Sequence, residues 1–191
     1  MPREGVFSRV IKGGTIREGD SVEVFPPDPK RAYTAAVITL SDRASSGEYE
    51  DRSGPLIQEF LTGQGMQVEE YLLLPDGREA LEKALIRLAD QREISLILTT
   101  GGTGFSERDC TPEATKAVCD REVPGIPEAL RQYSLTITKK AMLSRQTAGI
   151  RKYSLIINLP GSPKACKENL EFLFPELFHG IGILRGTEKE K

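Results

Sequence analysis

The sequence is poor in the residues that metal centres and disulfide frameworks require. Its one histidine, His179, cannot form a metal-binding histidine cluster and is a weak candidate for a catalytic base. The three cysteines are scattered, and no pair among Cys110, Cys119 and Cys166 has zinc-ligand spacing. Because a disulfide framework also favours an even number, we expect three buried thiols in a reducing cytoplasm.

Long apolar stretches and an excess of one charge are also missing. No run approaches the ~20 apolar residues needed to span a bilayer, and the N-terminus, MPREGVFSRV, lacks the apolar core of a signal peptide. Lys and Arg total 26 against 28 Asp and Glu, so the net charge is −2 and gives no overall basic field for nucleic acid. We therefore expect a cytoplasmic protein that binds neither nucleic acid nor membranes, although a local basic pocket for a small anion is compatible with these numbers.

The length and the composition of the chain indicate one globular domain with a short appendage. The chain has 191 residues, of which 38% are hydrophobic and 28% charged. Three prolines in four residues indicate a linker, and two short strand-like runs about Gly13-Gly14 predict a hairpin before it. We therefore expect a short β segment over 1–25, a linker over 26–32, a main domain over 33–184 and a charged tail over 185–191.

Strand-like and helix-like segments alternate after the linker. Apolar, β-branched runs predict strands over 33–40, 67–74 and 94–100, with a β-hairpin over 148–161 that turns near 151–153. Apolar residues at helical spacing predict helices over 53–65, 76–93, 111–122, 124–138 and 162–178. For the third of these helices, Thr111 is the expected N-cap and Pro112 the first helical residue. Such alternation predicts an α/β fold with a mainly parallel sheet.

Three polar loops follow predicted strands. They are 41–55, 99–109 and 158–164. The carboxyl ends of parallel strands meet at one edge of a sheet, which is where α/β sheets bind ligands. We therefore expect these three loops to lie together and to form one site.

The second loop, TTGGTGFSERD, has three glycines in four residues. It is not a Walker A loop, because Gly104 is followed by Phe105 rather than by lysine, and it lacks the GxGxxG spacing of dinucleotide-binding loops. A strand, a loop of small residues with exposed N–H groups and a helix N-terminus together favour a bound anion. The alternative is a tight connection with no further role.

Two aspartates accompany the ends of these strands. Asp109 precedes a helix and Asp76 follows the strand over 67–74. Each can be structural, Asp109 as a capping carboxylate and Asp76 as a turn residue, or the two can share a Mg²⁺ ion beside bound phosphates. No nucleophile motif such as GxSxG or a Cys/His pair is present. This favours phosphoryl or nucleotidyl transfer, since these reactions depend on alignment and charge neutralisation.

The third loop, NLPGSPK, has the pattern of a helix start. Gly161 ends the strand, Ser162 is the expected N-cap and Pro163 begins the helix. The loop is therefore either a good helix start or a second cluster of amides for a phosphate. Lys164 is electrostatically unfavourable at a bare helix N-terminus, and a bound anion would account for it. Arg145, Arg151 and Lys152 are either solvated surface residues or part of a basic lining for phosphates.

Six segments carry a specific resemblance to a known family, in chain order: LSDRASSGEYEDRSGP, LLLPDG, LTTGGTGFSERDCTPEAT, DREVPGIPEALR, LSRQTAGIRKYSLIINLPGSPKA and HGI. They cover essentially all of residues 33–184 and resemble the molybdopterin adenylyltransferase family of molybdenum cofactor biosynthesis, which includes bacterial enzymes and the gephyrin G domain. The resemblance implies a three-layer α/β fold and a homotrimer. It also implies that molybdopterin and ATP react, with Mg²⁺, to give adenylyl-molybdopterin and pyrophosphate. A molybdenum-insertion protein is an implied partner.

The resemblance also implies roles for the residues that match its motifs. Asp76 and Asp109 correspond to the catalytic pair and to the ligands of Mg²⁺. The implied cradle for ATP and its phosphates consists of Thr100, Gly101, Gly102, Thr103 and Gly104. The residues implied to bind the pterin substrate are Asp42, Ser45, Gly47, Gly161, Ser162 and Pro163.

The N-terminal segment departs from the minimal enzyme. It resembles the last stretch of a molybdenum cofactor sulfurase C-terminal (MOSC) domain without the body of that domain, and we expect no activity from it. Two alternative functions stay open for the main domain. One is a non-catalytic molybdopterin carrier or scaffold, and the other is a nucleotide hydrolase of the competence-damage type. The two aspartates and the SDRASSG segment favour the adenylyltransferase over both.

Overall fold

The structure of the chain is a computed structural model that describes residues 14–15, 17–21 and 33–188. The chain divides into two compact units, 1–31 and 32–191. In the first unit, the N–H of Arg17 donates to Asp20 Oδ2 over 2.7 Å. The predicted linker, the end of the predicted tail and most of the predicted N-terminal hairpin lie outside the described residues. The resemblance of this segment to a MOSC domain therefore stays a prediction.

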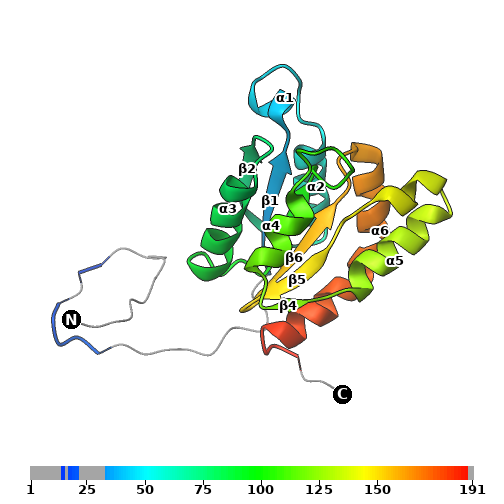
Figure 1. Cartoon of the computed structure of the whole chain (residues 1–191). Coiled ribbons are helices and arrows are strands. Elements are labelled where there is room, and N and C mark those ends of the chain that lie inside the picture. Colours follow the sequence, from blue (N-terminus) through cyan, green and yellow to red (C-terminus); the bar gives the residue numbers. More distant parts are fainter. Residues whose placement is uncertain (1–13, 16, 22–32, 189–191) are drawn as a thin grey trace. The chain divides into compact units, whose positions relative to one another are not determined.

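A six-stranded sheet with strand order β2-β1-β3-β6-β5-β4 forms the centre of the second unit (Figure 1). Four neighbours, β2, β1, β3 and β6, are parallel to one another. β5 pairs with β6 in the antiparallel direction, and β4 pairs with β5 in the antiparallel direction. The strands β1, β3 and β6 are almost wholly buried, which explains their continuous apolar sequence. The strands are β1 (Thr34–Leu40), β2 (Gln67–Leu74), β3 (Leu96–Thr100), β4 (Arg121–Glu122), β5 (Ala148–Arg151) and β6 (Ser154–Leu159). The predicted α/β fold, with a mainly parallel sheet and a hairpin, is confirmed.

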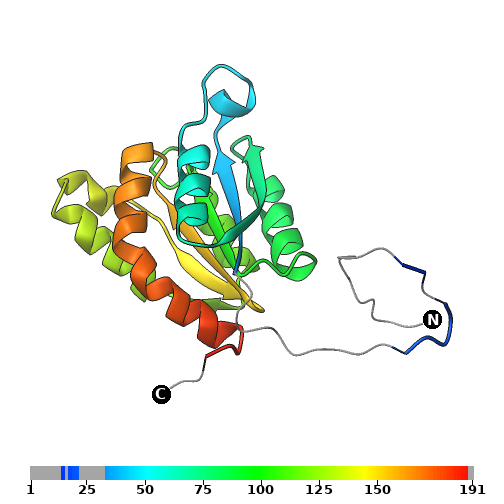
Figure 2. The same cartoon turned by 180° about the vertical axis from the view of Figure 1, so that it is seen from behind.

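Helices cover both faces of this sheet, which gives the three layers that the resemblance implies (Figures 1 and 2). Successive strand residues point to opposite faces, so Val37 packs in one core and Ile38 in the other. The first core takes the buried sides of α2, α5 and α6, and the second takes those of α3 and α4. The helices are α2 (Ser53–Gly63), α3 (Arg78–Asp90), α4 (Thr111–Val118), α5 (Gly125–Leu135) and α6 (Pro163–Leu184).

The predicted N-cap of α4 is wrong. Cys110 occupies the N-cap position, without a side-chain cap hydrogen bond, and Thr111 is already helical. The Thr111 Oγ1 donates instead to the carbonyl of Gly101 over 2.9 Å, and its side chain is fully buried. A tertiary contact with the glycine loop therefore outweighs the local capping preference of threonine.

The largest differences from the predicted helix bounds are at the C-terminal ends of α4 and α6. α4 ends at Val118, because the residues that follow it pair with β5 as strand β4. α6 continues to Leu184, because Leu177 and Ile181 extend its buried face and pack into the first core. The gain from burying these side chains outweighs the presence of Pro175 inside the helix.

Two short helices were not predicted. One is α1 (Asp42–Ser45), in the first polar loop, and the other is the 3₁₀ helix η1 (Lys139–Leu143) after α5. At the start of α1, Ser41 is the N-cap and its Oγ accepts a hydrogen bond from the Ala44 N–H over 3.2 Å. A serine before an aspartate is a helix-start signal that the sequence does contain.

The cysteines are free thiols, but only Cys166 is buried, whereas Cys110 and Cys119 are partly exposed. The prediction of three buried thiols is therefore wrong for two of them, which lie at the two ends of α4 rather than on its buried face. His179 Nδ1 lies 2.7 Å from Glu188 Oε2 in an exposed pair near the C-terminal end of α6.

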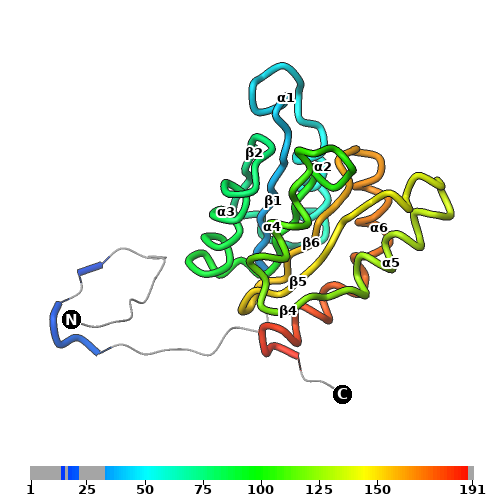
Figure 3. Tube along the Cα trace, in the orientation of Figure 1, coloured from blue at the N-terminus to red at the C-terminus, as the bar shows by residue number. Residues whose placement is uncertain are grey.

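All parallel strands end at the same edge of the sheet. The segments after β1, β2 and β3 all lie at this end of the domain, as the tube in Figure 3 shows at its upper side. None of the helices in the described part of the chain is long and apolar enough to cross a membrane.

Candidate active site

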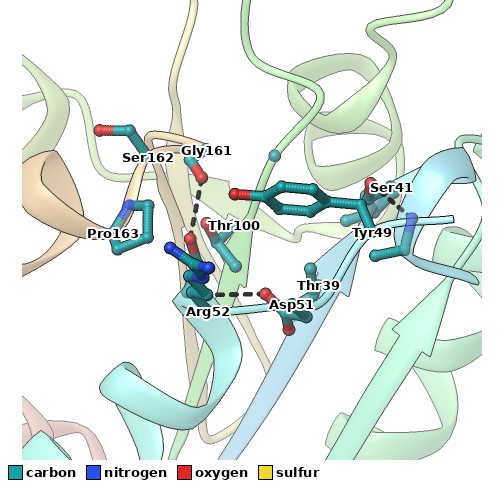
Figure 4. A pocket seen from close by; sticks show the side chains of 13 residues that line it. Thr39, Ser41, Tyr49, Asp51, Arg52, Thr100, Gly161, Ser162 and Pro163 are labelled. Carbon is teal, nitrogen blue, oxygen red and sulfur yellow. Dashed lines mark hydrogen bonds between the residues drawn. The ribbon is translucent and has the colours of Figure 1, made fainter. Parts of the chain in front are cut away.

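A cavity of about 390 Å³ lies where the three polar loops meet (Figure 4). Five predicted site residues line it: Thr100, Gly101, Gly161, Ser162 and Pro163. The rest of the lining comes from the end of β1, from α1 and from the segment that leads into α2. The predicted convergence of the three loops at one edge of the sheet is confirmed.

Sequence reasoning missed the residues that the first loop contributes to this cavity. They are chiefly Ser41, Tyr49, Asp51, Arg52 and Ser53. The only signal in the sequence was their place in a loop after a strand, because their orientation depends on how the loop folds back over the sheet. Eight predicted site residues belong to the same loops or to the loop after β2 but do not line the cavity: Asp42, Ser45, Gly47, Asp76, Gly102, Thr103, Gly104 and Asp109.

The carbonyl groups of residues 101–104 in the glycine loop all accept hydrogen bonds from the protein. Thr111 donates from Oγ1 to the Gly101 carbonyl over 2.9 Å and from N–H to the Gly102 carbonyl over 3.1 Å. Arg145 donates from N–H to the Thr103 carbonyl over 3.0 Å and from Nε to the Gly104 carbonyl over 2.6 Å. Four successive peptide oxygens therefore face the protein.

The N–H groups of the same loop have no such partners. None of the four N–H groups of residues 102–105 donates a hydrogen bond within the part of the chain that the structure describes. Gly101 and Gly102 have φ of +96° and +63°, a backbone conformation that turns successive N–H groups toward one side. Such a row of free donors beside a helix N-terminus provides a site for an anion.

Two glycines allow the second and third loops to pack closely. A Cβ on Gly101 would lie 2.2 Å from the carbonyl oxygen of Leu40, and a Cβ on Gly161 would lie 3.6 Å from the Gly101 Cα. Side chains at these positions would fill the space where backbone meets backbone. Both residues are therefore required by packing as well as by their place in the lining.

The third loop is held by hydroxyl and thiol groups from neighbouring elements. Thr100 Oγ1 and Cys166 Sγ both donate to the Pro160 carbonyl, over 2.6 and 2.8 Å, and Ser53 Oγ donates to the Gly161 carbonyl over 2.9 Å (Figure 4). Burial raises the pKa of the Cys166 thiol to about 11, so the thiol stays protonated and remains a donor. These bonds fix the floor of the cavity.

Asp76 is tied to the first loop. Its N–H donates to Asp42 Oδ1 over 3.0 Å, and its Oδ2 accepts from the Asp42 N–H over 3.1 Å. Asp42 also forms an ion pair with Arg108 of the glycine loop, with Nη2 and Oδ2 2.5 Å apart. This chain of contacts connects the loops that follow β1, β2 and β3.

Asp109 closes the glycine loop on itself. Its Oδ2 accepts from the Ser106 N–H over 3.0 Å, and its own N–H donates to the Ser106 carbonyl over 3.0 Å. The Oδ2 atom would lie 2.9 Å from a Cβ on Gly104, so glycine makes room for the carboxylate. Asp109 therefore has a structural role in the loop, in addition to the catalytic role that the sequence predicts.

The charges of the two predicted catalytic aspartates both act on the thiol of Cys110. Burial raises the pKa of the Cys110 thiol, and the carboxylates of Asp76 and Asp109 both raise it further. Both charges must therefore lie within electrostatic reach of one sulfur atom.

The carboxylates of Asp76 and Asp109 fit a magnesium ion that takes most of its ligands from substrate phosphates and water. No group of three or more His, Cys, Asp or Glu residues among the described residues could hold a metal. Mg²⁺, however, is commonly held by one or two carboxylates together with substrate phosphates and water. Asp76 and Asp109 each have one oxygen, Oδ1, that accepts no hydrogen bond within the described chain.

Asp51 organises the first loop beside the cavity. It accepts hydrogen bonds from the N–H groups of Ser53 and Gly54, over 2.9 and 3.2 Å, and from the hydroxyl of Tyr71. Burial alone would raise the pKa of Asp51, but the hydrogen bonds from Tyr71, Gly54 and Ser53 outweigh it and lower the pKa. Burial and the bond to Asp51 raise the pKa of Tyr71 to about 12, so the phenol remains a donor.

We expect the Asp51→Asn variant to lose about 1–3 kcal/mol of stability at pH 7, because an amide accepts these bonds less strongly than a carboxylate. The pKa of Asp51 is lower in the folded state, so its contribution is present above the unfolded pKa of about 3.9 and is lost as the pH falls through the folded value. Urea unfolding at pH 7, 4 and 3 measures this. A stability difference that stays constant over this range would contradict the assignment.

Comparison with known proteins identifies the class to which this fold and site belong. Residues 36–179 match the family described as a probable molybdopterin binding domain of molybdenum cofactor biosynthesis. The chain belongs to this family.

Particular relatives narrow the comparison further. The chain is 48% identical over 153 residues to the molybdopterin adenylyltransferase of Helicobacter pylori strain J99, which covers 79% of this chain and 87% of that protein. Among solved structures it is similar to the molybdopterin biosynthesis enzyme MoaB of Thermus thermophilus, with a TM-score of 0.77, 44% identity and coverage of 81% of this chain and 97% of that one. It is also similar to the tungsten cofactor synthesizing protein MoaB of Pyrococcus furiosus, with a TM-score of 0.72, 35% identity and coverage of 81% and 98%.

Proposed function

We propose that this protein is a molybdopterin adenylyltransferase, which transfers AMP from ATP to the terminal phosphate of molybdopterin and releases pyrophosphate. The observation that carries the proposal is the row of free N–H groups over residues 102–105, which directly follows Gly101 in the lining of a cavity formed by all three strand-end loops. Such a row of N–H donors binds phosphate groups, whichever molecule carries them. The name of the Helicobacter pylori relative, at 48% identity, supports the choice of reaction.

In this mechanism the protein aligns two phosphate groups and supplies no nucleophile. A phosphate oxygen of molybdopterin attacks the α-phosphorus of ATP in line, and the bond to the pyrophosphate breaks on the opposite side. The N–H groups of residues 102–105 donate to the ATP phosphates and stabilise charge that develops during transfer. The loop carbonyls cannot oppose this charge, because Thr111 and Arg145 hold them on the other side.

A magnesium ion would neutralise charge on the leaving pyrophosphate when bound. Asp76 and Asp109 would hold it through their free Oδ1 atoms. Asp42 positions Asp76 through two hydrogen bonds, in which the backbone N–H of each residue donates to the carboxylate of the other. The pterin substrate would lie on the side of Asp42, Ser45, Gly47 and the Gly161–Pro163 turn. Assembly as a homotrimer, a location in the cytoplasm and a molybdenum-insertion partner are part of the same proposal and rest on the family resemblance.

Pyrophosphate release with and without molybdopterin tests this function. We expect release from ATP only when molybdopterin and Mg²⁺ are both present. Tight binding of molybdopterin without consumption of ATP would instead favour a carrier or scaffold. Nucleotide hydrolysis that needs no pterin would favour a hydrolase on this fold.

The same proposal gives Tyr49 a role as a wall for a flat ring. In Figure 4 its ring lies across the cavity, with the hydroxyl directed toward the side formed by Gly161 and Thr100. Tyr49 is 48% exposed, although it borders a cavity, and the guanidinium of Arg43 lies 5.3 Å from the centroid of its ring. Adenine and the pterin are both flat heteroaromatic rings that stack on such a side chain.

We expect the Tyr49→Leu variant to raise the KM of one substrate about 3–10-fold, because the leucine side chain cannot stack. The Tyr49→Phe variant keeps the ring and should stay within about 2-fold of the original protein. Separate KM measurements for ATP and molybdopterin show which ring Tyr49 contacts. Unchanged KM values for both substrates in Tyr49→Leu would rule out this role.

A further inference from the structure

Arg145 makes four contacts with the segment over residues 103–113. Its N–H donates to the Thr103 carbonyl over 3.0 Å, and its Nε and Nη2 donate to the carbonyls of Gly104 and Asp109, each over 2.6 Å. Its Nη1 forms an ion pair with Glu113 in the first turn of α4. The sequence offered Arg145 as a surface residue or a phosphate-lining residue, but it does not line the cavity and its side chain is 32% exposed. Neither of these two predictions included its contacts with the backbone of the glycine loop.

Arg145 binds the carbonyls of two peptide groups of the loop whose N–H groups, those of Gly104 and Phe105, donate no hydrogen bond among the described residues. Each bond that Arg145 makes is to a peptide carbonyl or to Glu113, and none is to a group that could bind a phosphate. A peptide plane that presents its carbonyl to one side presents its N–H to the other. The carbonyl of one residue shares its peptide plane with the N–H of the next, so by binding the oxygens of residues 103 and 104 Arg145 determines which way the N–H groups of residues 104 and 105 face.

We propose that Arg145 is a positioning residue for ATP in this enzyme: it keeps the peptide groups of the glycine loop oriented so that their N–H groups, and not their carbonyls, face the phosphates. The inference rests on the proposed function, since it concerns the same loop. Arg145 does not touch the reacting atoms and acts only through the backbone that it holds.

The geometry requires a guanidinium group rather than any positive charge. The guanidinium reaches three acceptors in different directions, and only a planar group with several N–H donors can do so at once. Lysine has one nitrogen at the end of a flexible stem, so it would leave at least one of the two carbonyls without its donor. The loop is rich in glycine, and its peptide groups could then rotate at little steric cost.

Arg151 provides a matched control elsewhere in the domain. Its Nε and Nη2 donate to the two carboxylate oxygens of Asp90 over 2.9 and 2.6 Å, and its Nη1 donates to the Val118 carbonyl over 2.7 Å. It is also partly buried, with 20% of its side chain exposed. It lies at the end of β5, where the hairpin turns, and not at the carboxyl edge of the parallel strands.

The experiment compares Arg145→Lys and Arg145→Ala with Arg151→Lys in the full chain. For each variant, kcat, the KM of ATP and the KM of molybdopterin are measured from pyrophosphate release, and stability is measured by urea unfolding. We expect Arg145→Lys to raise the KM of ATP by about 10-fold or more, as expected for lost hydrogen bonds that involve a charged group. The KM of molybdopterin should change by less than about 2-fold, and Arg151→Lys should leave both KM values unchanged while lowering stability.

A KM of ATP that stays at the original value in Arg145→Lys would overturn the proposal. Equal increases in both KM values, in step with lost stability and matched by Arg151→Lys, would also overturn it, because the effect would then be general unfolding. Calorimetric titration with pyrophosphate gives a readout that does not need turnover. If the original protein binds pyrophosphate but releases none from ATP, the proposed reaction fails, while weaker pyrophosphate binding by Arg145→Lys still supports the positioning role. Equal binding by both proteins overturns it.

Discussion

The Asp109→Asn variant should release pyrophosphate about 10²–10⁴-fold more slowly than the original protein, with Mg-ATP and molybdopterin as substrates. The substitution removes the negative charge that would hold a metal ion beside the phosphates. It keeps an oxygen that can accept the hydrogen bond from the Ser106 N–H, so we expect the loop to keep its shape. The measured quantity is the initial rate of pyrophosphate release at saturating substrates.

Glu107→Gln is the matched control for this variant. Glu107 lies in the same loop and is exposed, and its replacement also removes one negative charge. We expect its rate to change less than about 2-fold. Pyrophosphate release by Asp109→Asn at the original rate would show that Asp109 has only its structural role in closing the loop.

The Gly101→Ala variant should be destabilised by about 3 kcal/mol or more and should lose activity. The new Cβ would lie 2.2 Å from the Leu40 carbonyl oxygen, a backbone atom that cannot move without disturbing β1. The φ of +96° adds strain that any residue other than glycine would feel. The free energy of unfolding in urea measures the effect on stability.

Gly65→Ala separates the two contributions. Gly65 follows α2 with a similar φ of +82°, but nothing lies within 4 Å of the Cβ that would be added there. It should therefore show the conformational cost alone, about 1 kcal/mol. If Gly101→Ala costs no more than Gly65→Ala, the close approach to Leu40 does not constrain the loop.

Much of the fold followed from local pattern. The runs YTAAVITL and ISLILTT were predicted as strands because strands buried on both faces are continuously apolar and β-branched, and both are strands of the central sheet. The meeting of the three polar loops followed from the rule for carboxyl ends of parallel strands. The ends of elements were less predictable. Thr111 does not take the predicted cap position, because its hydroxyl donates to the carbonyl of Gly101 in the loop after β3.

The partners of individual side chains could not be predicted in the same way. Arg145 lies 41 residues from Gly104 in sequence, and nothing in the residues around Arg145 indicates that its guanidinium binds that carbonyl. Tyr49 and Asp51 were part of a predicted loop, but their place in the cavity wall depends on how that loop turns back toward Tyr71 of β2.

The sequence alone therefore determined the α/β class, the family and the edge of the sheet where the site lies, because these depend on residue types repeated at short range and on motifs that stay together along the chain. Only the tertiary structure decided which groups of the glycine loop are free to bind a ligand. Each peptide offers both a donor and an acceptor, and which of the two faces the cavity depends on distant side chains such as Arg145 and Thr111 that bind the other.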